Sequence, residues 1–189
     1  MFQPQVKLFL PRRGEKLALS SIAERIWLAR QMSRIDRDIR KFGWAIVPFQ
    51  LPHDLAPRWL YTAGFEETLG HPEMIIFDTP PQVAFEEFGT AFESIVRDGQ
   101  RLEDGVVWTE DEGPKAVVRA VHPERLKSFG WLALAQERHL RKKGTLEGFR
   151  ALQLVLADLE GRLPWDAGHN EDARKWQPEL YTERDEDED

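Results

Sequence analysis

The sequence predicts an α+β fold, a single compact domain in which helices flank a mixed, largely antiparallel sheet. Apolar residues make up 41% and charged residues 31% of the 189 positions, which is typical of a globular protein. Strand-like and helix-like segments intermix without the regular strand–helix repeat of a doubly wound sheet. A chain of this length also buries enough surface to form a core without disulfides or metal.

The first third of the chain predicts two elements before the main sheet begins. Residues 2–10 alternate loosely between apolar and polar, and Pro4 limits them to an edge strand. A helix is expected from Ser20 or Ser21, which suit its N-cap, to Gly43, which suits its end. Its apolar residues recur every three or four positions: Ile22, Ile26, Ala29, Met32, Ile35 and Ile39.

The middle of the chain predicts three strands and a second helix. The strands cover residues 44–49, 59–65 and 73–78, which are rich in aromatic and β-branched side chains. The helix opens at Thr79-Pro80-Pro81 and ends at Gly99. Its expected buried side carries Val83, Phe85, Phe88, Phe92, Ile95 and Val96.

The last part of the chain predicts a hairpin, a helix and a final strand. Residues 106–108 and 116–121 form the hairpin around Gly113 and Pro114, and Pro123 begins a helical turn. A helix over residues 131–143 ends before Gly144, and a strand covers residues 149–157. Beyond Asp158 we expect loops. The domain division is therefore an N-terminal extension with an amphipathic helix (1–41), an α+β domain (42–181) and a disordered acidic tail (182–189).

Charge and composition exclude several classes of function. The net charge is −7, but the last seven residues hold six acids and one arginine, so the rest of the chain is nearly neutral. The basic side chains of the first helix are mixed with acids, which disfavours a nucleic-acid partner. The absence of cysteine excludes disulfides, thiolate metal sites and cysteine nucleophiles. No segment has the layout of a membrane span or a signal peptide, so we expect a cytoplasmic protein.

The five histidines show no local metal-ligand spacing, and no phosphate-binding loop or nucleophile elbow is present. We therefore predict no metal site, and the residues identify no cofactor. Two functional classes stay open. One is a binding or regulatory module for a small molecule or a protein partner. The other is an enzyme with metal-independent acid–base or hydrolytic chemistry.

The main candidate site lies between Tyr61 and Glu73. His71 titrates near neutral pH, and Glu73 can orient it or act as an acid or base, which makes these two the candidate catalytic residues. Tyr61 and Thr62 add hydroxyl groups, and Gly64 leaves the backbone accessible to a ligand. The alternative is structural: His71 builds the turn into the next strand and Glu73 caps or ties a loop.

Two further polar residues are candidate ligand-binding positions. Gln153 lies inside an apolar strand, where a buried amide must be hydrogen-bonded, so it either locks the sheet or faces a ligand. Asp158 follows at the end of the same strand. If the enzyme hypothesis holds, His71, Glu73 and Tyr61 converge with Asp158 on one concave pocket.

Several motifs in one order resemble the bacterial domain of unknown function 4262 family. They are Gly43-Trp44, Tyr61-Thr62-Ala63-Gly64-Phe65, His71-Pro72-Glu73, and Gln153-Leu154 followed by Asp158 and Gly161-Arg162-Leu163-Pro164-Trp165-Asp166. The resemblance runs from about Phe42 to Trp165, and Phe65 stands where the family usually has leucine. It implies that these positions belong to one domain, and it assigns no catalytic residue.

Overall fold

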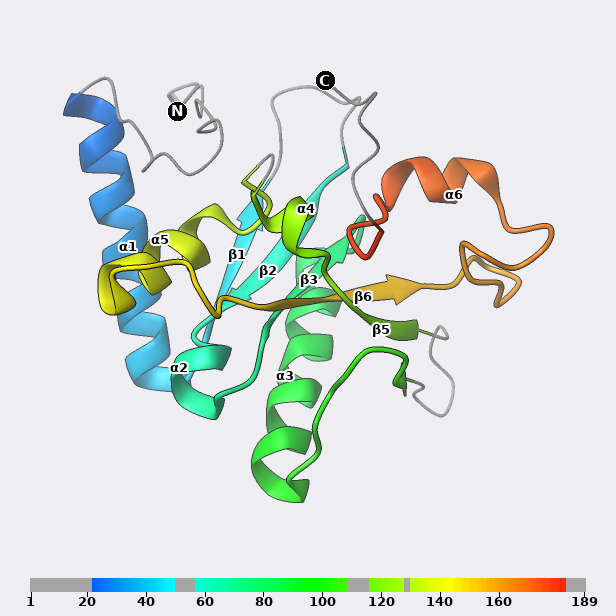
Figure 1. Ribbon diagram of the computed structural model, residues 1–189, viewed down its shortest axis with the longest axis horizontal. Helices are drawn as coiled ribbons and strands as arrows, with labels where there is room; N and C mark the ends of the chain where they lie inside the picture. Colours follow the sequence, from blue (N-terminus) through cyan, green and yellow to red (C-terminus); the bar gives the residue numbers. More distant parts are fainter. Residues whose placement is uncertain (1–21, 50–56, 109–115, 128–129, 183–189) are drawn as a thin grey trace.

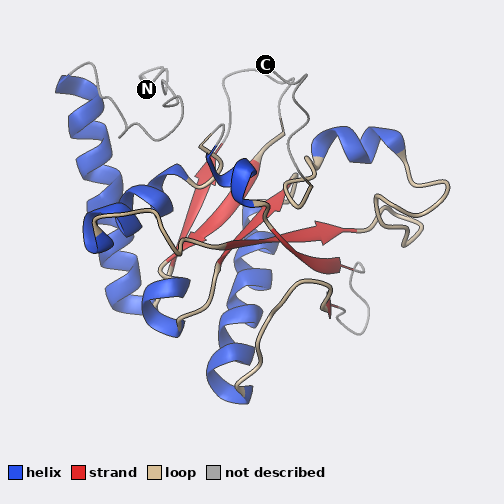
Figure 2. Cartoon of the chain, in the orientation of Figure 1, coloured by secondary structure: helices blue, strands red, loops and turns tan. Residues whose placement is uncertain are grey.

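The protein, described by a computed structural model over residues 22–49, 57–108, 116–127 and 130–182, is built around one six-stranded mixed sheet. The strand order is β1-β2-β3-β6-β5-β4 (Figure 2). Their bounds are β1 Ala45–Phe49, β2 Trp59–Ala63, β3 Glu73–Phe77, β4 Val107–Trp108, β5 Ala116–Ala120 and β6 Ala151–Leu156. Only β3 and β6 pair in parallel, with Glu73 opposite Ala151. The predicted α+β class with a largely antiparallel sheet is confirmed.

Helices cover both faces of this sheet (Figure 1). Their bounds are α1 Ile22–Phe42, α2 Phe65–Leu69, α3 Pro81–Asp98, α4 Pro123–Lys127, α5 Ala133–Lys143 and α6 Glu171–Trp176. Side chains of α1 and α5 pack with one set of strand residues, and those of α3 pack with the alternate set. This division follows from the pleat, since successive residues of a strand point to opposite faces. Within the described residues, no helix is long and apolar enough to cross a membrane.

Helix α1 belongs to the core of the domain. Leu28, Met32, Ile35 and Ile39 are buried in the same cluster as strands β1, β2 and β3. The boundary expected at residue 41 therefore does not separate this helix from the sheet. The expected apolar stripe was wrong at its start, because Ile22 and Ile26 are exposed. The sheet supports only the later turns of the helix.

Two other expectations need correction. The strand predicted over 59–65 ends at Ala63, because Gly64 takes a left-handed conformation with φ of 111° and the helix α2 starts at Phe65. The loop expected after Asp158 contains α6, whose first turn is capped by the Asn170 side chain accepting from the Asp172 amide.

The buried side of α3 also differs from the expected one. Ala84, Phe88 and Ala91 are buried, whereas Val83, Phe85 and Val96 are exposed. Two small alanines lie on the face that packs against the sheet, so large apolar residues alone do not mark that face. The strand expected over 2–10 and the acidic tail over 183–189 lie outside the described residues, as does the turn of the predicted hairpin.

Candidate functional site

The Glu73 carboxylate lies buried at the start of β3, where it holds the beginning of α2. Its Oε1 accepts from the Gly64 amide at 2.8 Å and from the Glu66 amide at 3.4 Å. Its Oε2 accepts from the Thr62 hydroxyl at 2.6 Å and from the Phe65 amide at 3.2 Å. Burial raises the pKa of Glu73, and these four hydrogen bonds oppose the rise. The arrangement matches the structural interpretation in which Glu73 ties a loop.

Gly64 makes this arrangement possible. Its φ of 111° belongs to the region that side chains rarely adopt, and it turns the chain so that three successive amides face Glu73. A Cβ at this position would lie 2.9 Å from Ile39 of helix α1. Thr62 completes the connection, because its hydroxyl accepts from the Met74 amide at 2.8 Å while donating to Glu73. Thr62 is fully buried, and the hydrogen bonds of its hydroxyl group link β2 to β3.

His71 is buried, and each of its ring nitrogens lies close to a carbonyl oxygen. Its Nδ1 lies 2.8 Å from the Pro72 carbonyl oxygen, and its Nε2 lies 3.2 Å from the Leu102 carbonyl oxygen. A neutral imidazole carries one N–H, so it donates to only one of these two acceptors. Burial lowers the pKa of His71, and the charge of Arg150 acts in the same direction. The ring thus connects the turn before β3 to the loop that follows α3.

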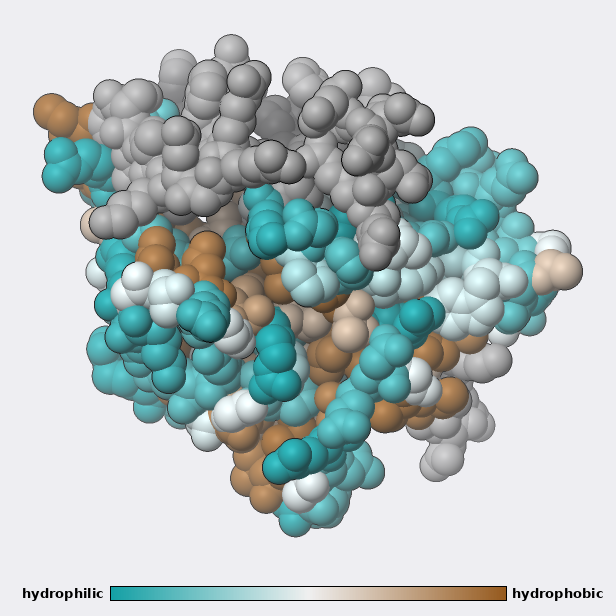
Figure 3. Space-filling model, in the orientation of Figure 1, coloured by the Kyte–Doolittle hydropathy of each residue, from teal (hydrophilic) through white to brown (hydrophobic). Residues whose placement is uncertain are grey.

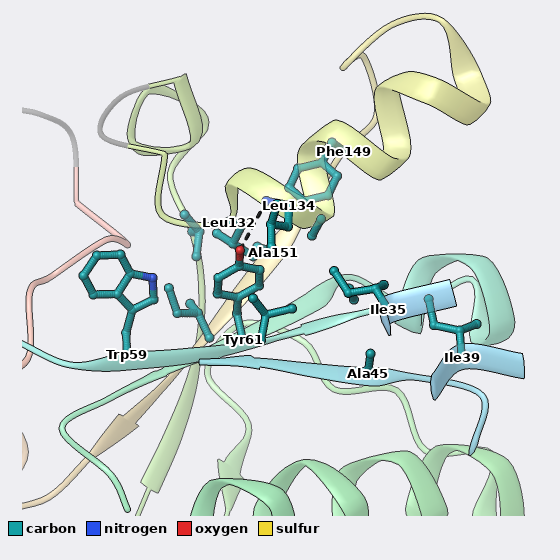
Figure 4. Close-up of a cluster of buried hydrophobic side chains, with 14 of the residues drawn as sticks. Ile35, Ile39, Ala45, Trp59, Tyr61, Leu132, Leu134, Phe149 and Ala151 are labelled. Atoms are coloured by element: carbon teal, nitrogen blue, oxygen red, sulfur yellow. Dashed lines mark hydrogen bonds between the residues drawn. The ribbon is translucent and has the colours of Figure 1, made fainter. Parts of the chain in front are cut away.

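Tyr61 lies in the core between β2 and α5, with its ring fully buried. Its hydroxyl oxygen accepts from the Leu134 amide at 3.2 Å, as Figure 4 shows. Burial raises the pKa of Tyr61 far above its ordinary value, so the phenol stays neutral. It supports the packing of α5 against the sheet.

Gln153 locks the C-terminal segment onto the sheet. The side-chain Nε2 donates to the Pro178 carbonyl oxygen at 2.8 Å, and Oε1 accepts from the Leu180 amide at 2.9 Å. Both polar groups of this fully buried amide are therefore occupied. Of the two interpretations left open for Gln153, this geometry matches the structural one.

Asp158 organises the loop that follows β6. Its carboxylate accepts from the amides of Glu160, Arg162 and Asn170 and from the Arg162 guanidinium. These hydrogen bonds lower the pKa of Asp158 to about 2 although desolvation acts in the opposite direction. The Asp158 side chain therefore stabilises the loop that runs from Asp158 to Asn170.

The expected constellation of His71, Glu73, Tyr61 and Asp158 does not form. His71 lies in the wall of one cavity and Glu73 in the wall of another, while neither Tyr61 nor Asp158 lines either cavity. His71 and Glu73 also share no hydrogen bond, because each is bonded to other groups. The structure therefore gives no support to chemistry in which these residues act together on one substrate.

The larger of these cavities has a volume of about 680 Å³. It lies between the loop after α3, the turn at His71, helix α4 and the start of β6. Its walls carry mainly apolar side chains, among them Leu69, Ile95, Leu102, Val121, Leu126 and Phe149. Figure 3 shows apolar side chains at the centre of this face, bordered by polar ones. The volume is within the range of small-molecule sites.

Two arginines without an ion-pair partner among the described residues line this cavity. Arg101 comes from the loop after α3, and Arg150 directly precedes β6. No carboxylate in the described part of the chain pairs with either of them. Asp104 also lines the cavity, but it accepts from the Ala120 amide at 2.7 Å and from Arg119 at 3.0 Å. The Ala120 amide holds the pKa of Asp104 below its ordinary value, and Arg119 adds to this effect.

The position of Arg150 is fixed by the parallel pair of strands. The Glu73 amide donates to the Arg150 carbonyl oxygen at 3.1 Å, which joins the starts of β3 and β6. Arg101 and Arg150 formally offset the two acids of the cavity, Glu103 and Asp104, but Asp104 is bonded to Arg119 and to the Ala120 amide. Sequence reasoning missed Arg101 and Arg150, because single arginines beside loops look like ordinary solvated residues.

Nothing in the described residues forms a metal site, since no group of three histidine, aspartate or glutamate side chains is close enough to hold an ion.

The family described as Domain of unknown function (DUF4262) matches this chain over residues 38–170. No curated protein and no solved structure matches the chain. The matched range includes all six strands and the helices α2, α3, α4 and α5.

Proposed function

The chain belongs to the DUF4262 family, and on this premise we propose that it is a binding module for a small amphipathic organic anion. The observation that carries the proposal is the cavity of about 680 Å³, which combines apolar walls with the unpaired side chains of Arg101 and Arg150. The proposal includes a cytoplasmic location in a bacterial cell, which agrees with a chain free of cysteine.

The chemistry of the walls indicates which part of the ligand lies where. The apolar side chains favour a hydrocarbon portion, whose burial releases about 25 cal/mol per Å². The guanidinium groups favour a carboxylate or a similar anion, since arginine offers paired donors in a planar arrangement. A small molecule suits a cavity of this volume better than a protein partner, which is the other occupant expected of a binding module.

His71 serves this site as a positioning residue. Its ring nitrogens lie 2.8 and 3.2 Å from the carbonyl oxygens of Pro72 and Leu102, and Leu102 follows Arg101 in the same loop. With its proton on Nε2, the ring donates to Leu102 and holds the loop that carries one of the two arginines. In this proposal Glu73 acts on the site only indirectly. It holds the start of the helix α2, which precedes His71.

Isothermal titration of the full chain with octanoate tests the proposal. Octan-1-ol is the matched probe, because it has the same hydrocarbon chain and lacks the charge. We expect octanoate to bind at least tenfold more tightly, and Arg101→Met and Arg150→Met each to weaken its binding by about 10- to 100-fold, as expected for a lost charge-assisted hydrogen bond.

Arg97→Met is the matched control, since Arg97 lies on α3, pairs with Glu93 and does not line the cavity. This variant should bind octanoate with unchanged affinity. Equal affinities for octanoate and octan-1-ol, or arginine variants that bind as the parent does, would overturn the anionic specificity. Failure of both probes to bind would overturn the proposed class of ligand.

A further inference from the structure

His71 lines the same cavity as the two arginines of the proposed anion site. The residue is only 6% exposed, and each ring nitrogen lies within hydrogen-bond distance of a backbone carbonyl oxygen, Nδ1 at 2.8 Å from Pro72 and Nε2 at 3.2 Å from Leu102. A neutral imidazole donates to one acceptor, whereas a protonated imidazole donates to two. The surroundings of the ring therefore offer an acceptor for a second proton, although burial disfavours the charged form.

Arg150 is a charged group that acts on the His71 ring. Burial lowers the pKa of His71 most strongly, the two carbonyl oxygens oppose this effect, and the charge of Arg150 lowers the pKa further. Arg150 has no ion-pair partner in the parts of the chain that the structure describes. An anion that pairs with Arg150 offsets this charge, so it leaves the two carbonyl oxygens to favour the protonated ring.

The other charged groups around His71 have fixed partners or offset one another. The elements next to the ring carry Glu66 and Glu67 on α2, Glu73 on β3, and Arg101, Glu103 and Asp104 after α3. The three acids of α2 and β3 bond to groups outside this cavity, and Asp104 bonds to Arg119. Arg101 and Glu103 carry opposite charges on either side of Leu102. The charge at Arg150 is therefore the one that a bound anion changes most directly.

We propose that His71 takes up a proton from solvent when an organic anion binds at Arg101 and Arg150, a coupling that rests on the function proposed above. The protonated ring then donates to both carbonyl oxygens. The hydrogen bond to Leu102 holds the loop that carries Arg101 while the ligand is bound. Because linkage is reciprocal, the anion favours protonation of His71 by the same factor by which protonation favours the anion. The cavity therefore binds its ligand more tightly as the pH falls.

Nuclear magnetic resonance of the full chain with ¹⁵N-labelled histidine measures the pKa of His71 directly. We expect octanoate to raise this pKa, and octan-1-ol, which lacks the charge, to leave it unchanged. Octanoate keeps its charge between pH 8 and pH 6, because carboxylic acids titrate at about pH 4–5. If octanoate binds and the pKa of His71 does not rise, the coupling is overturned while the proposed function stands. Failure of octanoate to bind overturns both.

Calorimetric titration over the same pH range measures the effect of the proton on affinity. We expect octanoate to bind about two- to tenfold more tightly at pH 6 than at pH 8, within the limit of about tenfold per pH unit for one proton. His71→Gln should abolish this dependence. His169→Gln is the matched control and should retain it, since His169 does not line the cavity. An affinity of the parent that is the same at both pH values would overturn the coupling.

Arg150→Met tests the interaction between Arg150 and His71 without any ligand. The pKa of His71 should rise in the free variant, because the guanidinium no longer acts on the ring. Arg97→Met is the matched control and should leave the pKa unchanged, since Arg97 pairs with Glu93 and does not line the cavity. An unchanged pKa in Arg150→Met would show that the charge at Arg150 does not control protonation of His71, and it would overturn the coupling.

Discussion

The Thr62 hydroxyl donates to the buried Glu73 carboxylate across 2.6 Å, which joins the end of β2 to the start of β3. The same carboxylate accepts from the amides of Gly64, Phe65 and Glu66. The segment between the two residues contains the helix α2 and the turn that follows it, and one side chain holds its start. This explains physically why threonine, glycine and glutamate stand at these spacings.

Glu73→Gln should destabilise the fold. The substituted amide keeps one acceptor oxygen but points its NH₂ group at backbone amides, so buried donors lose their partner. We expect a loss of about 1–3 kcal/mol in the free energy of unfolding, measured by urea denaturation. Glu86→Gln on the exposed side of α3 is the matched control and should change it by less than about 0.5 kcal/mol. Equal stability of the two variants would contradict the role assigned to Glu73.

Gly64→Ala should cost more stability than Gly70→Ala. Both glycines have positive φ, at 111° and 65°, so both substitutions strain the backbone. At Gly64 the added Cβ also meets Ile39 at 2.9 Å and the Gly43 carbonyl oxygen at 3.3 Å, whereas nothing lies within 4 Å at Gly70. We expect about 1 kcal/mol for Gly70→Ala and clearly more for Gly64→Ala, measured by thermal unfolding. The reverse order would show that α1 moves to accommodate the methyl group.

The protein should lose stability through His71 as the pH falls below about 6.5. Burial lowers the pKa of His71 in the folded state, so the unfolded chain binds the proton more readily. The contribution of His71 is fully present above the unfolded pKa of 6.5 and is lost progressively below it. Glu73 has the opposite effect on stability. Its pKa is raised in the folded state, so its contribution to stability increases as the pH falls.

The comparison of the parent with His71→Gln isolates this contribution. We expect the difference in unfolding free energy between the two proteins to shrink as the pH falls from 7 toward 5. A difference that stays constant over this range would show that the folded and unfolded chains bind the proton at His71 equally.

Gln153→Leu should release the C-terminal segment from the sheet. Leucine has a similar size but leaves the Pro178 carbonyl oxygen and the Leu180 amide without their partner. Hydrogen exchange of the Leu180 amide should become faster, and the unfolding free energy should fall by about 1–3 kcal/mol. Gln82→Leu on the exposed side of α3 serves as the control. Unchanged protection at Leu180 would contradict the locking role of Gln153.

The sequence predicted most elements of this fold, because their signals are local. Pro81 and Gly99 bound α3 and Gly144 follows α5, as expected from proline at a helix start and glycine after a helix end. It missed the short helix α2, since five residues carry too little periodicity to be distinguished from the end of a strand. It also overestimated the buried length of α1, because apolar spacing does not reveal how much of a helix the sheet can cover.

The sequence by itself determined which segments become strands and helices, and which polar residues must find partners because they lie among apolar ones. Only the tertiary structure decided what those partners are. His71 and Glu73 lie two positions apart in the chain, yet β3 begins at Glu73 and the two side chains line different cavities. Arg101 and Arg150 are far apart in the chain, yet the pairing of β5 and β6 and the loop after α3 bring them to one cavity. Hydrophobic periodicity encodes the local conformation, whereas the meeting of distant side chains depends on how the whole sheet assembles.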